Sequence, residues 1–338
     1  MPLMSIAEAL REAIREEMRR DERVFCIGED IGIPGGFGGA FTVTLGLSEE
    51  FGHERILDTP ISEILIAGAA VGAAITGMRP IADVQYGDFL FCMMDQIVNQ
   101  AAKLTYMSGG RLRVPLVLRA PVGATTRGAQ HAQSLEGFFT HVPGWKVICP
   151  STAYDAKGLL KTAIRDDNPV LVFEHKLLYG SKGPRSEKGA LSPVGEVPTG
   201  EYLIPFGKAA VRREGTDITV LANLLMVYRV LEAADVLEKE GISLEVIDPR
   251  TLVPFDYEIV YQSLSKTSRL MIVHEDTRRN GWGAEVAASI SEKAFSLLRA
   301  PIQRVATCDV PIPFAPVMEK FVVPSVERIV DEVRKMME

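Results

Sequence analysis

Short apolar runs alternate along the chain with longer segments in which apolar residues recur at the helical period. In the first half, the short runs predict strands at 24–27, 80–86, 114–119, 146–150 and 169–174. The longer segments predict helices at 5–20, 60–77, 89–107 and 154–165. Strands that are separated by helical crossovers form a parallel sheet with helices on both faces. The pattern therefore predicts an α/β fold.

The same alternation returns after residue 206. It predicts strands at 217–221, 243–247, 270–274 and 302–306, and helices at 226–240, 257–264, 283–298 and 325–337. Four prolines between residues 311 and 324 predict an extended segment before the last helix. Residues 176–206 are rich in Gly, Pro, Lys and Glu and show no period, so we interpret them as a linker. The chain should form two doubly wound domains, 1–175 and 207–338.

The segment 57–77 (LDTPISEILIAGAAVGAAITG) predicts a helix that is apolar on nearly every side. Thr59 is a good N-cap and Pro60 suits the first helical position, which places Glu63 in the first turn. Because a helix that is apolar all round is normally buried, we expect Glu63 to be buried too. A buried carboxylate is costly unless it is hydrogen-bonded or protonated. Glu63 therefore either caps its own helix, at the positive end of the dipole, or belongs to an active site.

Composition narrows the classes of function. The 338 residues are 47% hydrophobic, which suffices for two domains of ordinary size. A net charge of −7 with scattered basic residues argues against a nucleic-acid partner. Four widely spaced cysteines without a C-x-x-C pair favour a reducing compartment over a zinc site or disulfides. The absence of a signal core or membrane-length apolar run predicts a cytoplasmic protein that binds no membrane, with a mature mitochondrial form as the alternative.

Several familiar catalytic motifs are missing. The Gly-rich loop 32–39 contains neither dinucleotide nor P-loop fingerprint, so Glu29 before it is a surface-turn residue or a cofactor contact. No two histidines have metal-ligand spacing, and there is no G-x-S-x-G elbow. What remains is Glu63, Gln85 at a strand end, and His131 on the long loop 121–137, where a hydrogen-bonded loop histidine is the plain alternative. These groups can move protons, but harder chemistry must come from a cofactor or another chain.

Several long segments, in order, resemble one family. They are GEDIG (28–32), LDTPISE (57–63), DQIVNQAAK (95–103), YMSGG (106–110), PSTAYDAKGLLKTAIRDDNP (150–169), EHKLLYG (174–180) and IDPRTLVPFD (247–256). The chain resembles, over almost its whole length, the beta subunit of the thiamine-diphosphate-dependent decarboxylating component of 2-oxo acid dehydrogenase complexes. The resemblance implies a pyrimidine-binding domain followed by a transketolase C-terminal-like domain.

The activity that the resemblance implies is oxidative decarboxylation of a small 2-oxo acid, with transfer of the acyl group to a lipoyl arm. Pyruvate is the expected substrate. A branched-chain 2-oxo acid dehydrogenase and an acetoin-cleaving dehydrogenase are the alternatives within the family. A non-catalytic α/β assembly subunit is the alternative from a different class.

The resemblance also implies roles for individual residues. Glu63 corresponds to the glutamate that hydrogen-bonds the pyrimidine nitrogen of thiamine diphosphate, and His131 to a histidine near the reacting centre that assists the lipoyl step. Gln85 and Phe89 would line the pyrimidine pocket, with Glu29 near the cofactor. A monovalent cation, K⁺, would be held by Leu116, Ala163, Ile164, Asp166 and Asn168, mostly through main-chain oxygens.

Half of the expected site is missing from the sequence. There is no G-D-G motif, so by the resemblance an alpha subunit should hold Mg²⁺ and the diphosphate in an α₂β₂ assembly, with helix 57–77 at an interface. A lipoyl-bearing dihydrolipoyl acyltransferase core would be a further partner. Two departures bear on the site: Ala132 stands where the family commonly has Ser, and Asp83 where it more often has Glu. Ala132 puts the hydrogen bonding of the His131 loop in doubt.

Overall fold

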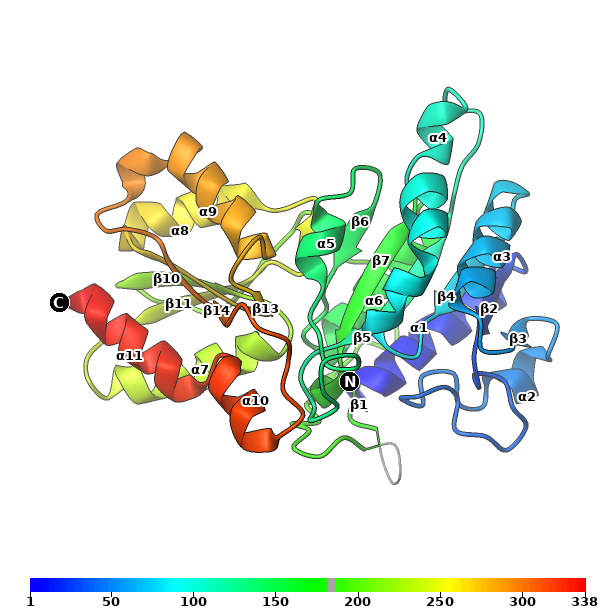
Figure 1. Cartoon of the computed structure of the whole chain (residues 1–338), viewed down its shortest axis with the longest axis horizontal. Helices are drawn as coiled ribbons and strands as arrows, with labels where there is room; N and C mark the ends of the chain where they lie inside the picture. Colours follow the sequence, from blue (N-terminus) through cyan, green and yellow to red (C-terminus); the bar gives the residue numbers. More distant parts are fainter. Residues whose placement is uncertain (182–185) are drawn as a thin grey trace.

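The computed structural model describes residues 1–181 and 186–338, which form two α/β halves side by side (Figure 1). The first half contains a seven-stranded sheet in the order β12-β6-β7-β5-β4-β2-β3. Its strands are β2 (Val24–Gly28), β3 (Ile56–Asp58), β4 (Arg79–Asp83), β5 (Val117–Val122), β6 (Lys146–Ile148), β7 (Val170–His175) and β12 (Thr251–Val253). Neighbouring strands are parallel except for β12, which comes from the second half and pairs antiparallel with β6.

The second half contains a five-stranded sheet in the order β14-β13-β10-β11-β9. Its strands are β9 (Ala210–Arg213), β10 (Ile218–Ala222), β11 (Leu244–Asp248), β13 (Leu270–Thr277) and β14 (Gln303–Thr307). Only β9 runs antiparallel to its neighbour. A third, two-stranded sheet pairs β1 (Leu3–Ser5) with β8 (Val194–Glu196), so the predicted linker contains one strand. The alternating pattern thus predicted α/β architecture in both halves correctly.

Helices cover both faces of the two sheets, and the apolar core on each face continues from one half into the other. One face carries α1 (Ile6–Arg20), α6 (Ala153–Arg165), α7 (Leu225–Glu238) and α11 (Val326–Met337). The other carries α3 (Glu63–Ile75), η1 (Gly87–Met93), η2 (Asp95–Ala101), α4 (Leu104–Met107), α5 (Glu136–Thr140), α8 (Tyr257–Thr267), α9 (Trp282–Lys293) and η5 (Phe295–Leu297). The remaining short helices among the described residues are α2 (Leu47–Phe51), η3 (Lys176–Leu178) and α10 (Pro316–Val322).

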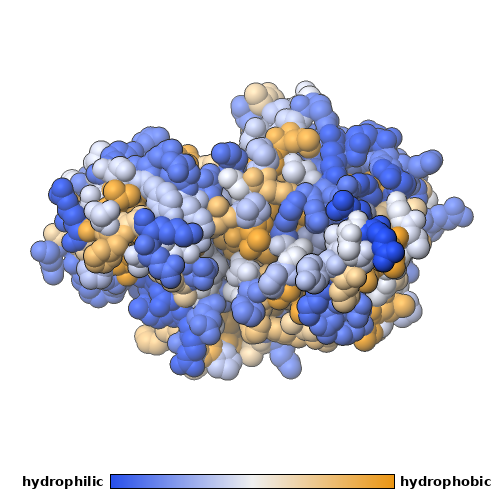
Figure 2. Space-filling model, turned by 90° about the horizontal axis from the view of Figure 1, so that it is seen from above, coloured by the Kyte–Doolittle hydropathy of each residue, from blue (hydrophilic) through white to orange (hydrophobic). Residues whose placement is uncertain are grey.

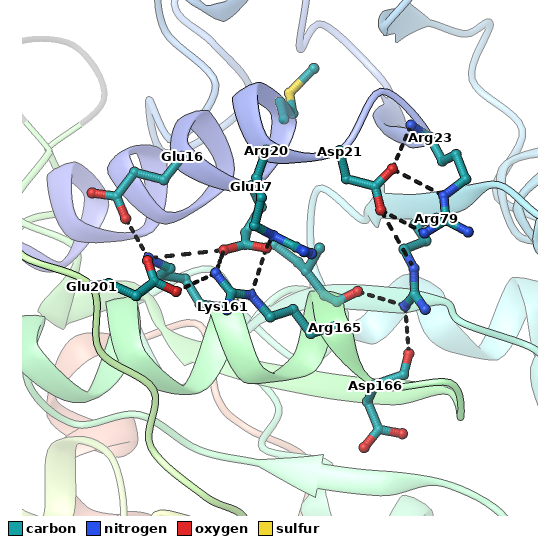
Figure 3. A network of polar contacts seen from close by, with 12 residues as sticks. Glu16, Glu17, Arg20, Asp21, Arg23, Arg79, Lys161, Arg165, Asp166 and Glu201 are labelled. Atoms are coloured by element: carbon teal, nitrogen blue, oxygen red, sulfur yellow. Dashed lines mark hydrogen bonds and ion pairs between the residues drawn. The ribbon is translucent and has the colours of Figure 1, made fainter.

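Helices α1 and α6 pack along each other and share a network of ion pairs (Figure 3). The capping box that opens α1 is present, with Ser5 and Glu8 bonded to each other's backbone as predicted. At the centre of the network, Lys161 Nζ lies 2.6 Å from Glu16 and 2.7 Å from Glu201. The carboxylate of Glu17 is fully buried and accepts from Arg20 and Arg165. Every charge in this network thus has a partner of opposite sign.

Three predicted elements need correction. Helix α3 begins at Glu63 rather than near Thr59, because the Thr59 N–H donates to Gly28 O (3.0 Å) and prolongs the β2–β3 ladder. The predicted helix 89–107 is divided into a 3₁₀ segment, a π-helical segment and a short α-helix, although it stops at Gly109 and Gly110 as expected. The proline-rich segment before the last helix contains α10, which Pro316 opens at N1, so it is not extended throughout.

Helix α3 is also less buried than its sequence predicts. Ile61, Ile64 and Leu65 are exposed by 84%, 54% and 48% at its start. Elsewhere, apolar surface gathers in the middle of the molecule when it is viewed from above (Figure 2). No helix within the described residues has the length and apolarity to cross a bilayer. The four cysteines are free thiols.

Candidate active site

The carboxyl ends of four parallel strands of the first sheet meet at one edge. Glu29 follows β2, Gln85 lies just past β4, and Lys176 directly follows β7. The loop that carries His131 leaves from the end of β5. Chain segments that are far apart in the sequence therefore bring their side chains to one place, as parallel α/β sheets commonly do at this edge.

Gln85 contacts Glu29, and Glu63 lies near enough for its charge to act on the Glu29 carboxyl. The Gln85 side-chain amide donates to the main-chain oxygen of Glu29 at 2.5 Å. Burial raises the pKa of Glu29, and the nearby negative charge of Glu63 adds to the rise. Glu63 itself is half-buried, which corrects the expectation of a buried carboxylate. No hydrogen bond or ion pair within the described parts of the chain uses its carboxylate, which is left available to a ligand.

His131 lies between two aromatic rings. Its imidazole packs edge-to-face against Tyr86, with ring centroids 5.0 Å apart, and against Phe89, at 5.4 Å. These contacts orient the ring without using a side-chain hydrogen bond. The structure thus brings together two of the predicted site residues, His131 and Phe89, and adds Tyr86, which the sequence analysis did not single out.

The loop before His131 is held by two carboxylates from the second half of the chain. Glu275, in β13, accepts from the backbone N–H of Ala124 at 2.5 Å, and its other oxygen lies 2.9 Å from His175 Nε2. Glu319, in α10, accepts from the N–H of Thr126 at 2.7 Å. Burial alone would raise the pKa of Glu275. The neighbouring His175 and the hydrogen bond from Ala124 N–H instead hold this pKa below its ordinary value. Two carboxyl groups, those of Glu275 and Glu319, therefore fix the backbone of this loop at two points.

Beneath the site, one guanidinium serves two buried carboxylates. Arg119, in β5, binds Glu174 through two nitrogens at 2.9 and 2.6 Å and also contacts Asp83. Tyr179 donates its hydroxyl hydrogen to Glu174. Burial raises the pKa of Asp83 to about 6; Arg119 opposes the rise and Glu174 adds to it. The family that the chain resembles more often has Glu at position 83. Asp83 nevertheless contacts Arg119 and belongs to this network.

Ala132 has a structural explanation. Its side chain is buried in a small apolar cluster with Ala124, Ile312 and Val322. A serine hydroxyl at this position would enter apolar surroundings. Side chains outside the loop bond its backbone, so the missing hydroxyl does not leave it unsupported.

The five residues predicted to bind a monovalent cation lie at the opposite, amino edge of the sheet. Arg79 donates to the carbonyl oxygens of Ile164 and Asp166 at 3.0 Å each (Figure 3). Lys146 pairs with the Asp166 carboxylate. Protein donors thus already bond the carbonyl oxygens of Ile164 and Asp166 and the Asp166 carboxylate, although each carbonyl oxygen retains a second lone pair. A cation here stays a prediction, and we derive no step through one.

A cavity of about 1110 Å³ lies between the two halves and is separate from Glu63. Its lining includes Gln133, from the His131 loop, and Asp276 and Trp282 from the second half. Asp276 accepts from the N–H of Gly137 at 2.8 Å at its wall. Burial raises the pKa of Asp276, and the hydrogen bonds that it accepts from backbone N–H groups, including that of Gly137, oppose the rise.

Sequence reasoning missed Tyr86, Arg119, Glu174, Lys176, Glu275 and Glu319. One signal was available for Glu174 and Lys176, because charged residues that end an apolar strand face the same edge as Gln85. The same signal existed for Glu275, which follows the apolar strand 270–274, but the sequence could not show what it contacts, and no signal placed Glu319, because the contacts of both cross between the two halves.

Comparison with known proteins gives a consistent result. Residues 3–182 match the pyrimidine binding domain of transketolase, and residues 207–329 match the transketolase C-terminal domain. The chain is 47% identical to the 2-oxoisovalerate dehydrogenase subunit beta of Bacillus subtilis, over 100% of both chains. It is 46% identical to the acetoin:2,6-dichlorophenolindophenol oxidoreductase subunit beta of Cupriavidus necator, over 99% of this chain and 97% of that one. The pyruvate dehydrogenase E1 component subunit beta of Rickettsia felis is 44% identical, over 98% of each.

Solved structures agree on the fold. A split-gene transketolase described as an inactive β4 tetramer superposes with a TM-score of 0.77 at 22% identity, covering 98% of this chain and 97% of that chain. Transketolase from Leishmania mexicana gives a TM-score of 0.70 at 15% identity, covering 99% of this chain but 46% of that one. The chain thus has the fold of about half of a single-chain transketolase.

Proposed function

The chain belongs to the family of E1 beta subunits of the pyruvate, 2-oxoisovalerate and acetoin dehydrogenases, and we propose that it supplies the cofactor-activating half of such an enzyme's site. One observation carries the proposal: the carboxylate of Glu63 stands beside Glu29 without a protein partner in the described chain, at the sheet edge that also presents His131. The full-length relatives act on three different substrates at similar identity. Pyruvate therefore stays a prediction beside a branched-chain 2-oxo acid and acetoin.

The residues present fit thiamine diphosphate. Glu63 offers an open carboxylate to the pyrimidine ring nitrogen, and Gln85 and Phe89 lie where they can border the ring. When bound, the cofactor supplies the nucleophilic carbon and the electron sink that decarboxylation requires. Glu63 holds a proton at the pyrimidine nitrogen and so tunes the cofactor rather than attacking the substrate. Burial and the negative charge of Glu63 raise the pKa of Glu29, so a negative charge on Glu29 is disfavoured at this position.

His131 acts at the step that follows decarboxylation. We propose that its imidazole moves a proton when the acyl group passes to a lipoyl arm on a separate acyltransferase core. Two aromatic rings fix its orientation, and a general acid or base must lie within hydrogen-bond reach of the atom it serves. Phe89 contacts His131. It would therefore lie between the pyrimidine pocket of the cofactor and the histidine that serves acyl transfer.

The other half of the site would come from an alpha subunit. No G-D-G motif occurs in this chain, so the proposed partner holds Mg²⁺ and the diphosphate. The exposed apolar residues at the start of α3, which include Ile61 and Ile64, border Glu63 and would be covered in an α₂β₂ assembly. Isolated chain should therefore bind thiamine diphosphate weakly, and tight Mg²⁺-dependent binding in calorimetry would refute the division of the site.

The experiment that tests the proposal replaces Glu63 in the enzyme reconstituted with its alpha subunit. Glu63→Gln keeps the size of the side chain but cannot hold the same proton. We expect assembly to be retained in size-exclusion chromatography while turnover falls by roughly 10²–10⁴-fold. Glu54→Gln, at an exposed position, is the matched control and should leave turnover unchanged.

Two outcomes would contradict this proposal. Near-normal turnover by Glu63→Gln would favour a non-catalytic assembly subunit. Assays of the unmodified enzyme with pyruvate, 3-methyl-2-oxobutanoate and acetoin would assign the substrate. The absence of turnover with any 2-oxo acid would exclude a 2-oxo acid dehydrogenase, and the absence of turnover with acetoin as well would exclude the proposed function.

A further inference from the structure

Lys176 is a buried cation that the proposed chemistry does not use. Its side chain is 1% exposed, just past the carboxyl end of β7. Within the described residues, no carboxylate lies within ion-pair distance of its ammonium; Asp88, Glu275 and Glu187 act on it only from farther away. Burial lowers its pKa to about 8. A buried ammonium without a close counter-ion costs stability, so stability does not explain this lysine.

The contacts of Lys176 converge on His131. Its ammonium donates to the main-chain oxygen of His131. The same nitrogen lies 5.0 Å from the centroid of the Tyr86 ring, a cation–π contact. Tyr86 in turn packs edge-to-face on the imidazole of His131. One ammonium therefore holds both the backbone of His131 and the ring that orients its side chain.

We propose that Lys176 is a positioning residue that fixes the backbone and the imidazole orientation of His131. This inference rests on the proposed function, in which His131 moves a proton during acyl transfer, and it adds a residue that positions His131 for that step. Lys176 itself touches neither substrate nor cofactor. Its effect on the reaction passes through the loop.

Other hydrogen bonds hold both ends of the His131 loop, so the loss of the Lys176 contact should affect only the residues between them. Glu275 and Glu319 hold its first residues through Ala124 and Thr126. On the far side of His131, Asp88 accepts from the Gln133 side chain at 2.7 Å. Loss of the Lys176 contact should therefore loosen residues 127–132, while both ends of the loop stay fixed.

The first test is hydrogen exchange on the full chain. Lys176→Met removes the charge and the donor at nearly constant length, and Lys176→Arg keeps both. In Lys176→Met, the amides of residues 127–132 should exchange about tenfold faster, and Lys176→Arg should restore much of the protection. Lys161→Met is the matched control, because Lys161 is an equally buried lysine in a network on α6 that does not touch this loop. It should leave the exchange of the loop unchanged.

The second test measures kinetics in the reconstituted enzyme. Misplacement of a reacting group by about 1 Å can cost roughly 10²-fold, so Lys176→Met should lower kcat for acyl transfer by about 10- to 100-fold. The kcat/KM for the 2-oxo acid should change by less than about twofold, because His131 acts after that substrate has been decarboxylated, and the KM for the 2-oxo acid should therefore fall together with kcat. Lys176→Arg should recover a large part of kcat.

Two results would overturn the inference: unchanged exchange of residues 127–132 in Lys176→Met, or unchanged kcat in that variant. If the unmodified enzyme turns over no 2-oxo acid and no acetoin, the proposed function fails. In that case hydrogen exchange still decides whether Lys176 fixes the loop, so the two failures are distinguishable.

Discussion

Lys161 and Lys176 are both buried, at 0% and 1% exposure, but their surroundings have opposite effects. Around Lys161, burial would lower the pKa, but hydrogen bonds to Glu16 and Glu201 raise it above the ordinary value. Around Lys176, burial lowers the pKa to about 8, and the more distant Asp88 and Glu275 only partly oppose it. The α1–α6 network is arranged so that each charge stabilises another (Figure 3). The sheet edge instead keeps charges that are incompletely paired, as active sites often do.

The same contrast holds for carboxylates. In the α1–α6 network, Glu17 is fully buried and bonds two arginines. At the sheet edge, Asp83 shares a single arginine with Glu174, and Glu63 has no protein partner in the described chain. Charge pairing therefore differs between the two regions, even for buried carboxylates such as Glu17 and Asp83. Incomplete charge pairing marks the sheet edge as the region whose charged groups serve function rather than stability.

The largest expected effect is on the paired network. Glu17→Ala should lower the free energy of unfolding by about 3 kcal/mol, because Arg165 loses its buried acceptor and keeps only Glu201 as a partner. Denaturant unfolding at pH 7 measures this loss, and kcat per folded enzyme should be unchanged. A loss below about 1 kcal/mol would show that the network resembles an ordinary surface set of ion pairs.

A smaller effect separates the two lysines directly. Lys161→Met should destabilise the chain by about 2 kcal/mol, since Glu16 and Glu201 each lose one partner but keep another. Lys176→Met should change stability by less than about 1 kcal/mol, because an apolar side chain replaces an underpaired buried cation. Parallel denaturant curves for the two variants provide the measurement. Equal losses of unfolding free energy in the two variants would contradict the difference in charge pairing between the α1–α6 network and the sheet edge.

The third prediction concerns pH. Between about pH 3.8 and 6, folded Asp83 holds a proton that the unfolded chain has released, so its contribution to the free energy of unfolding falls as the pH rises through that window. Asp83→Asn cannot titrate. The variant should gain stability relative to the unmodified protein across this range, by at most about 3 kcal/mol. Arg119 keeps Glu174 as its partner throughout. A difference that is independent of pH would contradict the raised pKa.

The smallest effect is expected at Ala132. Ala132→Ser places a hydroxyl in the apolar cluster with Ile312 and Val322 and should cost about 1 kcal/mol. Thermal unfolding would detect it, and kcat should change by less than about threefold. A gain in stability would mean that the hydroxyl finds a partner in the loop, as the resemblance to the family suggests.

Much of the fold followed from local pattern. Apolar period and crossovers predicted most strands and long helices of both halves, but not the edge strands β3, β9 and β12, and the capping box predicted the start of α1. The start of α3 was misplaced because the β2–β3 ladder, a contact between distant segments, keeps Thr59 extended. Helix 89–107 was predicted as continuous because its apolar period continues through the 3₁₀ and π-helical turns.

The sequence by itself determined the α/β class, the family and the candidates Glu63, Gln85, Phe89 and His131, because periodicity and motifs are local properties. The tertiary structure alone decided that Glu63 is half-buried, that Asp83 shares an arginine with Glu174, and that Lys176 holds His131. Burial and charge pairing depend on which segments meet at the sheet edge. That meeting joins residues as far apart as Ala124 and Glu275, which no local pattern connects.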